Sequence, residues 1–145
     1  MADVGASLSQ ILSERLQLIQ TTTLDGSSVS LAAISATGTN NDLVISSTEG
    51  VDLDGAVNIG SEDLDITFDT IDGPGAVLVA IDQNITAGMI GISGTGNNDE
   101  INVATDLSSG AALSLDTVAT IDIDADITSA GSLTLSGATV EIEGS

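Results

Sequence analysis

Apolar and polar residues alternate in short bursts along most of the chain after Thr23. Alternation with a period of two places every second side chain on one face of a β-strand. Gly, Asn, Ser, Thr and Asp lie between the bursts, as expected of turns. The pattern predicts an all-β domain over residues 25–145, built of short strands with one buried face. The main bursts are Val51/Leu53, Val57/Ile59, Leu64/Ile66/Phe68, Val77/Val79/Ile81, Ile101/Val103, Leu113/Leu115, Ile121/Ile123, Leu133/Leu135 and Val140/Ile142.

Residues 1–24 follow a different pattern. Ser7 and Gln10 have the spacing of a capping box, in which a serine and a glutamine satisfy free N–H groups at a helix start. We therefore predict an amphipathic helix over residues 7–20, which either caps one end of the β-domain or is donated to a neighbouring copy. Its apolar face, a candidate self-assembly surface, consists of Leu8, Ile11, Leu12, Leu16 and Ile19.

Two segments of the chain resemble each other. Residues 35–45 read SATGTNNDLVI and residues 93–103 read SGTGNNDEINV, an offset of 93 − 35 = 58 residues. The similarity suggests two diverged units, 35–92 and 93–145. The alternative is that the two turns are alike because both are made of turn-forming residues.

The core has to be built almost without aromatic rings. The chain has 145 residues, of which 41% are hydrophobic, yet it contains one Phe and no Trp or Tyr. Small aliphatic side chains stack well in repetitive layers, which favours a β-solenoid. The alternative fold is a β-sandwich whose open groove accepts a strand or segment from the next copy.

The charge is strongly one-sided. The 22 acidic residues face a single basic one, Arg15, and the formal net charge is −21. Nucleic-acid binding needs Lys and Arg, and so does docking on an anionic membrane, so neither is expected. No stretch is long enough to be inserted in a membrane, and no signal peptide is visible. Copies of the chain would repel one another unless cations or a basic partner intervened.

Catalysis lacks its usual side chains. The sequence has no His, Cys, Tyr or Lys, which removes most general bases and nucleophiles. We expect no enzyme activity.

The polar residues favour the binding of hard cations, which prefer oxygen ligands, over catalysis. Asp outnumbers Glu by 16 to 6, and many of these carboxylates lie beside Gly and Asn in turns. The candidate metal ligands are Asn41 and Asp42 in the first Asn-Asn-Asp turn, and Asn98, Asp99 and Glu100 in the second. Calcium is the expected ion. Acidic pairs such as Asp52/Asp54 and Asp63/Asp65, and the triplet Asp122/Asp124/Asp126, predict acidic stripes on the outer face.

Two resemblances to known families add to this picture. Gly94, Gly96, Asp99 and Ile101 resemble the calcium nonapeptide of RTX (repeat-in-toxin) proteins, with an imperfect copy at residues 38–45. Residues 119–127 and 131–137 resemble β-helix adhesins of the filamentous haemagglutinin type in composition and rhythm. These resemblances imply parallel β-coils, calcium binding and a role at the cell surface.

The sequence therefore predicts a structural protein. The apolar alternation of residues 133–142 indicates an open β end, and an open end together with a dissimilar N-terminal segment suggests head-to-tail contact. We expect a subunit that assembles with itself into an extracellular or cell-surface filament, sheath or matrix, with calcium. A cell-surface adhesin fragment and an intracellular scaffold polymer are the alternatives.

Overall fold

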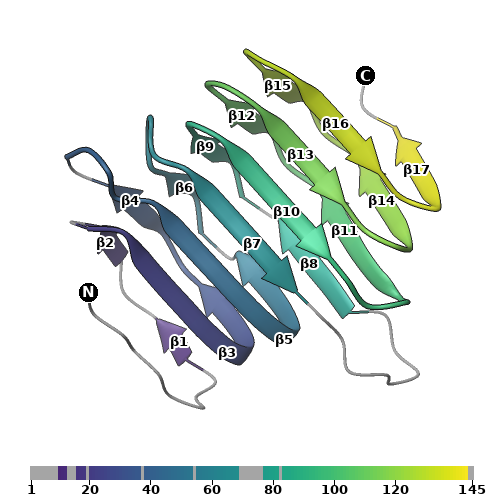
Figure 1. Ribbon diagram of the computed structural model, residues 1–145, viewed down its shortest axis with the longest axis horizontal. Helices are drawn as coiled ribbons and strands as arrows, with labels where there is room; N and C mark the ends of the chain where they lie inside the picture. The colour runs from purple at the N-terminus through teal and green to yellow at the C-terminus, as the bar shows by residue number, and fades with distance from the viewer. Residues whose placement is uncertain are drawn as a thin grey trace.

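The computed structural model describes residues 10–12, 16–18, 20–36, 38–53, 55–68, 77–81 and 83–143. These residues form a β-solenoid of about five turns, in which parallel strands wind around a shared core (Figure 1). No helix long and apolar enough to cross a membrane occurs among them. The predicted all-β solenoid is confirmed.

Each turn of the solenoid, called a coil below, passes over three faces. Face 1 stacks the first halves of β3 (Thr22–Leu31) and β5 (Leu43–Leu53), followed by β7 (Leu64–Phe68), β10 (Ile90–Gly94), β13 (Leu113–Asp116) and β16 (Leu133–Ser136). Face 2 stacks β1 (Gln10–Leu12), the second halves of β3 and β5, β8 (Val77–Ile81), β11 (Asp99–Val103), β14 (Thr120–Ile123) and β17 (Thr139–Ile142). Face 3 stacks β2 (Leu16–Leu18), β4 (Ile34–Ala36), β6 (Val57–Asn58), β9 (Ile85–Ala87), β12 (Leu107–Ser109) and β15 (Ile127–Ser129).

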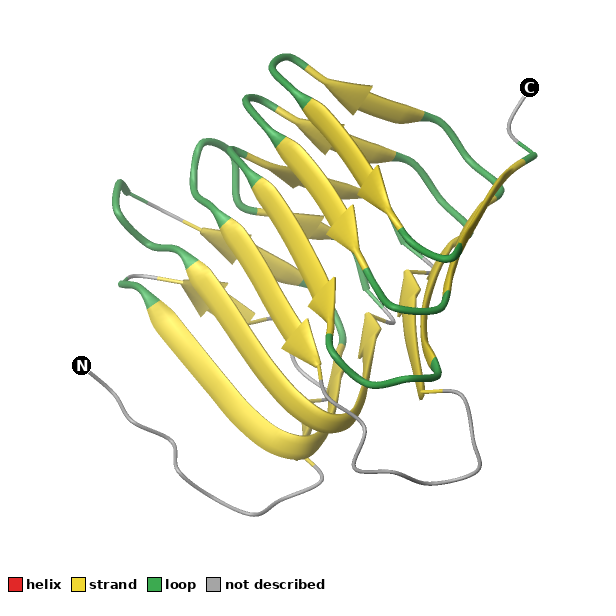
Figure 2. Ribbon diagram, turned by 45° about the vertical axis from the view of Figure 1, so that its right-hand side comes forward, coloured by secondary structure: helices red, strands yellow, loops and turns green. Residues whose placement is uncertain are grey.

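The long strands β3 and β5 bend from face 1 into face 2, so these two faces belong to one sheet (Figure 2). Residues that pair in register from coil to coil form a column along the solenoid axis. On face 1, successive members of one column are between 133 − 113 = 20 and 90 − 64 = 26 residues apart. The longest coil includes residues 69–76, which lie outside the described residues.

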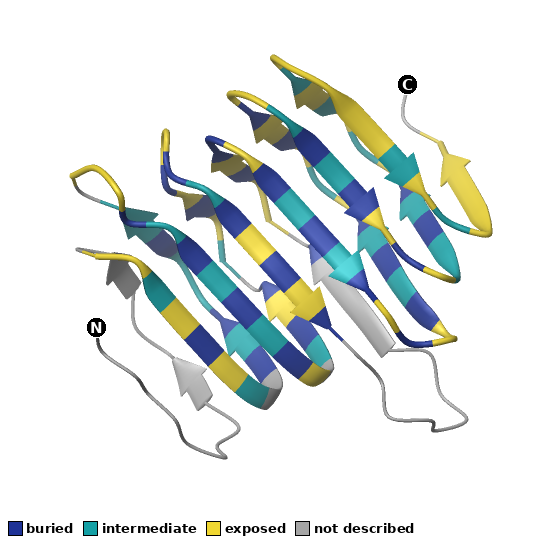
Figure 3. Cartoon of the chain, in the orientation of Figure 1, coloured by how far each residue is buried: buried dark blue, intermediate teal, exposed yellow. Residues whose placement is uncertain are grey.

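The core consists of aliphatic columns that point inward from all three faces. Alternate residues are buried along strands such as β7, β10 and β11, which gives the banded pattern of Figure 3. Burial of one such side chain stabilises a fold by about 1.5–3 kcal/mol. The fully buried members include Leu43, Ile45, Leu64, Ile66, Phe68, Ile85, Ile101, Leu113, Leu115 and Ile121. The predicted aliphatic layers therefore exist, with Phe68 as the one aromatic ring among them.

The helix predicted over residues 7–20 is wrong for the part of that segment that the structure describes. Gln10–Leu12 and Leu16–Leu18 are the parallel strands β1 and β2, paired with β3 and β4. Helix periodicity is a local signal, and tertiary context overrides it here because the neighbouring strand edges offer hydrogen bonds to each residue. Among the predicted assembly residues, Ile11 and Leu12 lie in β1 and Leu16 lies in β2, whereas Leu8 and Ile19 lie outside the described residues.

Candidate functional site

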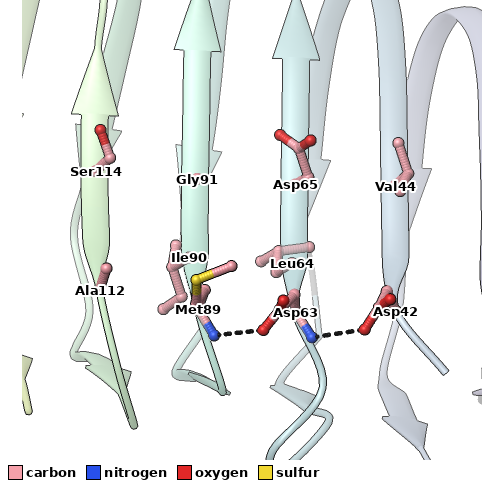
Figure 4. A pocket seen from close by; sticks show the side chains of 10 residues that line it. All are labelled: Asp42, Val44, Asp63, Leu64, Asp65, Met89, Ile90, Gly91, Ala112 and Ser114. Atoms are coloured by element: carbon pink, nitrogen blue, oxygen red, sulfur yellow. Dashed lines mark hydrogen bonds between the residues drawn. The ribbon is translucent and has the colours of Figure 1, made fainter. Parts of the chain in front are cut away.

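The first Asn-Asn-Asp turn lies where the chain enters face 1. Gly38 and Asn40 have φ angles of 107° and 63°, which allow the tight reversal ahead of β5. Oδ1 of Asp42 accepts a hydrogen bond from the N–H of Asp63, with 3.1 Å between the two atoms. Oδ1 of Asp63 accepts one from the N–H of Met89 at 2.9 Å (Figure 4). These two carboxylates thus connect three successive coils at one corner.

Asn41 is buried beside this aspartate ladder. Its backbone N–H donates to Oε2 of Glu62, with 2.5 Å between nitrogen and oxygen. The other carboxylate oxygen of Glu62 accepts a hydrogen bond from the hydroxyl of Ser61 at 3.1 Å. The acidic groups near the first turn therefore act as acceptors for neighbouring coils.

The second turn encloses a carboxylate. Asp99 is fully buried, and its Oδ2 accepts a hydrogen bond from the N–H of Gly96 at 2.5 Å. Its carbonyl accepts one from the hydroxyl of Thr117, on the next coil, at 2.6 Å. A Cβ at Gly94 would stand 2.6 Å from Cζ of Phe68 and 2.9 Å from Cβ of Asp99, so the packing requires a glycine there. Two further members of this candidate site are more open: Asn98 is exposed and Glu100 is partly exposed.

The two turns occupy different places in the coil. Asn41 and Asp42 lead into face 1, whereas residues 98–100 lead into face 2, where Asp99 pairs in register with Val77. The structure thus brings Asp42 to Asp63 rather than to a counterpart of Asp99. Among the described residues, no group of three or more acidic side chains is arranged to hold a metal ion.

A further acidic corner joins face 2 to face 3. Asp106, Asp124 and Asp126 are exposed around a shallow depression of about 380 Å³ that also includes Asn84. The N–H of Asp126 donates to Oδ1 of Asp106 at 3.4 Å. The predicted acidic stripe contains Asp124 and Asp126 together with Asp122, but not Asp106. The interval of one coil, 126 − 106 = 20 residues, was the signal that could have found it.

A groove of about 440 Å³ crosses the outside of face 1. Asp65 and Ser114 lie on its two sides, and Gly91 between them has no side chain to fill the space (Figure 4). Asp65 is exposed on the outer face as predicted, whereas Asp63, Asp124 and Asp126 of the predicted stripes lie at corners outside the strands. The groove has no convergent set of polar side chains that would define a ligand.

The last coil leaves its inward-facing residues uncovered. Leu133 is 49% exposed, Val140 38% and Ile142 62%, although all three continue columns that are buried in the preceding coil. The strands β15, β16 and β17 form this end of the solenoid, and no described strand lies beyond them (Figures 1 and 3). A hollow of about 220 Å³ opens there, lined by Ile123, Ala125, Asp126, Ile127, Leu133, Leu135 and Ile142.

These three strands also present unpaired backbone groups. A strand in a parallel sheet offers N–H and C=O groups to both neighbours, and β15, β16 and β17 have a described neighbour on one side only. Natural edge strands are usually blocked by charge, proline, a bulge or a covering segment. The described part of this end has acidic residues at Glu141 and Glu143 and no proline. Exposed apolar side chains and unpaired strand edges therefore occur together at this end.

No family model matches this chain, and no curated protein or solved structure matches it. The resemblance to β-helix repeat proteins is therefore supported at the level of the fold, which is a β-solenoid.

Proposed function

We propose that this chain is a structural subunit that joins copies of itself head to tail, through the two ends of the solenoid, into a filament. The observation that carries the proposal is the last coil, where Leu133, Val140 and Ile142 are exposed beside unpaired strand edges. Contiguous exposed apolar residues indicate an interaction surface. A parallel sheet edge accepts a further parallel strand, and the opposite end of another copy supplies strands of the same kind. Contact between unlike ends repeats without closing unless rotation forms a ring.

The proposal includes cations because each copy carries a formal charge of −21. Repulsion between copies opposes association, and salt or bound ions reduce it. Calcium is the proposed ion because the outer surface offers carboxylates such as Asp52 and Asp65, which are exposed, and calcium prefers oxygen ligands.

We further propose that the filament is non-enzymatic and lies outside the cell or on its surface. An adhesin fragment and an intracellular scaffold remain the alternative functions. Staining of intact and permeabilised cells with an antibody against the chain distinguishes these locations, since an intracellular polymer is labelled only after permeabilisation.

The decisive experiment compares two valine substitutions. Val140→Lys places a charge in the exposed apolar end, whereas Val118→Lys places the same charge at a corner between β13 and β14, where the valine is 51% exposed. We expect Val140→Lys to abolish association, because a lysine inside the junction would be buried without a partner. Val118→Lys should assemble like the unmodified chain.

Sedimentation and negative-stain microscopy would measure assembly, and circular dichroism would verify that both variants fold. If the unmodified chain stays monomeric at high concentration with calcium present, the proposal fails. It also fails if Val118→Lys and Val140→Lys associate equally well.

A further inference from the structure

The three faces do not carry the same number of described strands. Faces 1 and 3 each have six, whereas face 2 has seven, because β1 precedes β3 there. A filament whose sheets run without gaps from copy to copy needs the same number of strands on every face. Face 2 therefore has one strand too many, at one of its two ends.

The two ends fit together if a single strand is removed. Without β1, β16 can pair with residues 22–25 of β3 in the next copy, and β15 can pair with β2. On face 2, β17 then takes the place beside residues 29–31 of β3, which β1 occupies in the free chain. Either β1 or β17 must leave, since both fill the same position in the stack.

The columns distinguish β1 from β17. In one inward column of face 2 the residues are Val29, Val51, Ile101, Ile121 and Val140, but the register places Gln10 at that position of β1. In the neighbouring column the register places Ile11 beside Ser30, and the further members are Asp52, Ala80, Asn102, Asp122 and Glu141. Thus β1 places the polar residue Gln10 in a column whose other members are aliphatic, whereas β17 (Thr139–Ile142) places Val140 there.

The neighbouring strand β2 does match the column that it continues on face 3. Leu16 lies in the inward column that also contains Ile34, Val57, Ile85, Leu107 and Ile127. This column would continue unbroken from Ile127 of one copy to Leu16 of the next. On face 3 the residue types at the N-terminal end therefore match those of the last coil. On face 2 they do not match, because β1 is the first strand there.

The residues that would face each other across this junction are also compatible in charge. In four outward columns the last coil would meet the next copy as Thr134 beside Thr23, Ser136 beside Asp25, Glu141 beside Ser30 and Thr128 beside Gln17. None of these pairs sets one acidic residue against another, although the chain is strongly acidic. Like charges directly opposite each other destabilise a sheet, and this junction avoids them.

We infer that β1 is a removable cap, displaced during assembly by β17 of a second copy. The inference rests on the proposed function, since it concerns the same head-to-tail contact. In the free chain β1 shields residues 29–31 of β3, and in the filament Val140 of the neighbour pairs with Val29. Because β1 has to be displaced before two copies associate, it slows the start of assembly. A copy adds to the filament when its β17 displaces β1 from the edge of β3.

Cysteine cross-linking tests which residues meet at the junction. The chain has no cysteine, so each single substitution introduces one reactive thiol. Copies with Val140→Cys are mixed with copies carrying either Val29→Cys or Gln10→Cys and oxidised mildly. Directly paired strands stand about 4.8 Å apart, within the Cα range of a disulfide. As a control, Val29→Cys with Val51→Cys in one chain should form an internal disulfide, because these residues pair in register.

We expect cross-links between positions 140 and 29. Cross-links between positions 140 and 10 would show that β1 stays in place, and filaments without a 140–29 cross-link would equally overturn the inference while leaving the proposed function intact. If neither filaments nor cross-links form while the internal control closes, the head-to-tail function itself fails.

A matched pair of glutamine substitutions tests the cap directly. Gln10→Val gives β1 the residue type of its column, whereas Gln17→Val makes the same change in an outward column of β2 beside Ser35. Gln10→Val should raise the concentration needed for assembly about tenfold, equivalent to about 1.4 kcal/mol. Gln17→Val should leave it within about twofold, on the scale of ordinary surface substitutions. If Gln10→Val assembles as readily as the unmodified chain, β1 is not a cap that competes with β17.

Discussion

At the scale of single residues, polar groups at the corners fix how one coil sits on the next. The hydroxyl of Ser109 is 2.8 Å from the carbonyl oxygen of Ala112 and 3.0 Å from that of Gly88, and Ser129 repeats the arrangement one coil later. No buried side-chain nitrogen or oxygen in the described residues lacks a hydrogen-bond partner. Because a buried group without a partner is costly, shifting one coil against its neighbour would be penalised at every corner.

Asp99 provides the residue-scale prediction. Asp99→Ala should lower the free energy of unfolding by about 1–3 kcal/mol, because the N–H of Gly96 loses its buried acceptor. Asp99→Asn keeps a side-chain oxygen and should lose less. Glu100→Ala, at the partly exposed neighbouring position, should change stability by no more than about 0.5 kcal/mol. Urea denaturation measures all three variants, and an Asp99→Ala variant as stable as the unmodified chain would contradict the structural role of this carboxylate.

At the scale of strands, the alternating pattern predicted which residues face the core but not how the strands stack. The inward positions of Leu113 and Leu115 could be read from the sequence because the period of two is local. Consecutive bursts do not pair with each other, however; each pairs with a burst about one coil away. The coils differ in length, so no fixed repeat is visible, and the 58-residue similarity joined turns from different corners. The carbonyl of Asp99 accepts a hydrogen bond from the hydroxyl of Thr117 in the next coil, a contact that the local pattern does not reveal.

A deletion of one whole coil is the prediction at this scale. Leu113 and Leu133 occupy one column, so removing residues 113–132 and joining Ala112 to Leu133 keeps every later strand in register. The shortened chain should remain folded and rich in β-structure. Removing residues 113–122 instead deletes half a coil and places later strands on the wrong faces, so that variant should unfold. Circular dichroism and thermal melting measure the difference, and equal behaviour of the two deletions would contradict the column assignment.

At the scale of the whole molecule, the surface charge opposes the contact that the ends favour. The outward residues Asp52, Asp65 and Glu141 are exposed on different coils. The net charge of −21 makes copies of the chain repel one another. Association should therefore depend on the ionic medium more than folding does.

Calcium titration tests this expectation. Adding calcium should lower the concentration at which the chain assembles, and a chelator should reverse the effect, because divalent ions can bridge carboxylates on neighbouring copies. Light scattering with sodium chloride at equal ionic strength is the control. If sodium acts as strongly as calcium, simple screening accounts for the effect and calcium has no specific role. Calorimetry on Asp42→Ala and Asp99→Ala separately measures whether either predicted turn contributes to calcium binding.

The winding of the chain has a mechanical consequence. The strands lie across the solenoid axis, so a pull along the axis loads the hydrogen bonds between coils, while the covalent chain runs around the circumference. One coil of 20 residues adds about 4.8 Å to the axis, yet it contains roughly 66–68 Å of fully extended backbone. A fibre built this way would be stiff under small tension and would lengthen many times over as coils peel off one after another. The contour length released as coils unwind would let such a fibre absorb mechanical work before the covalent backbone is loaded.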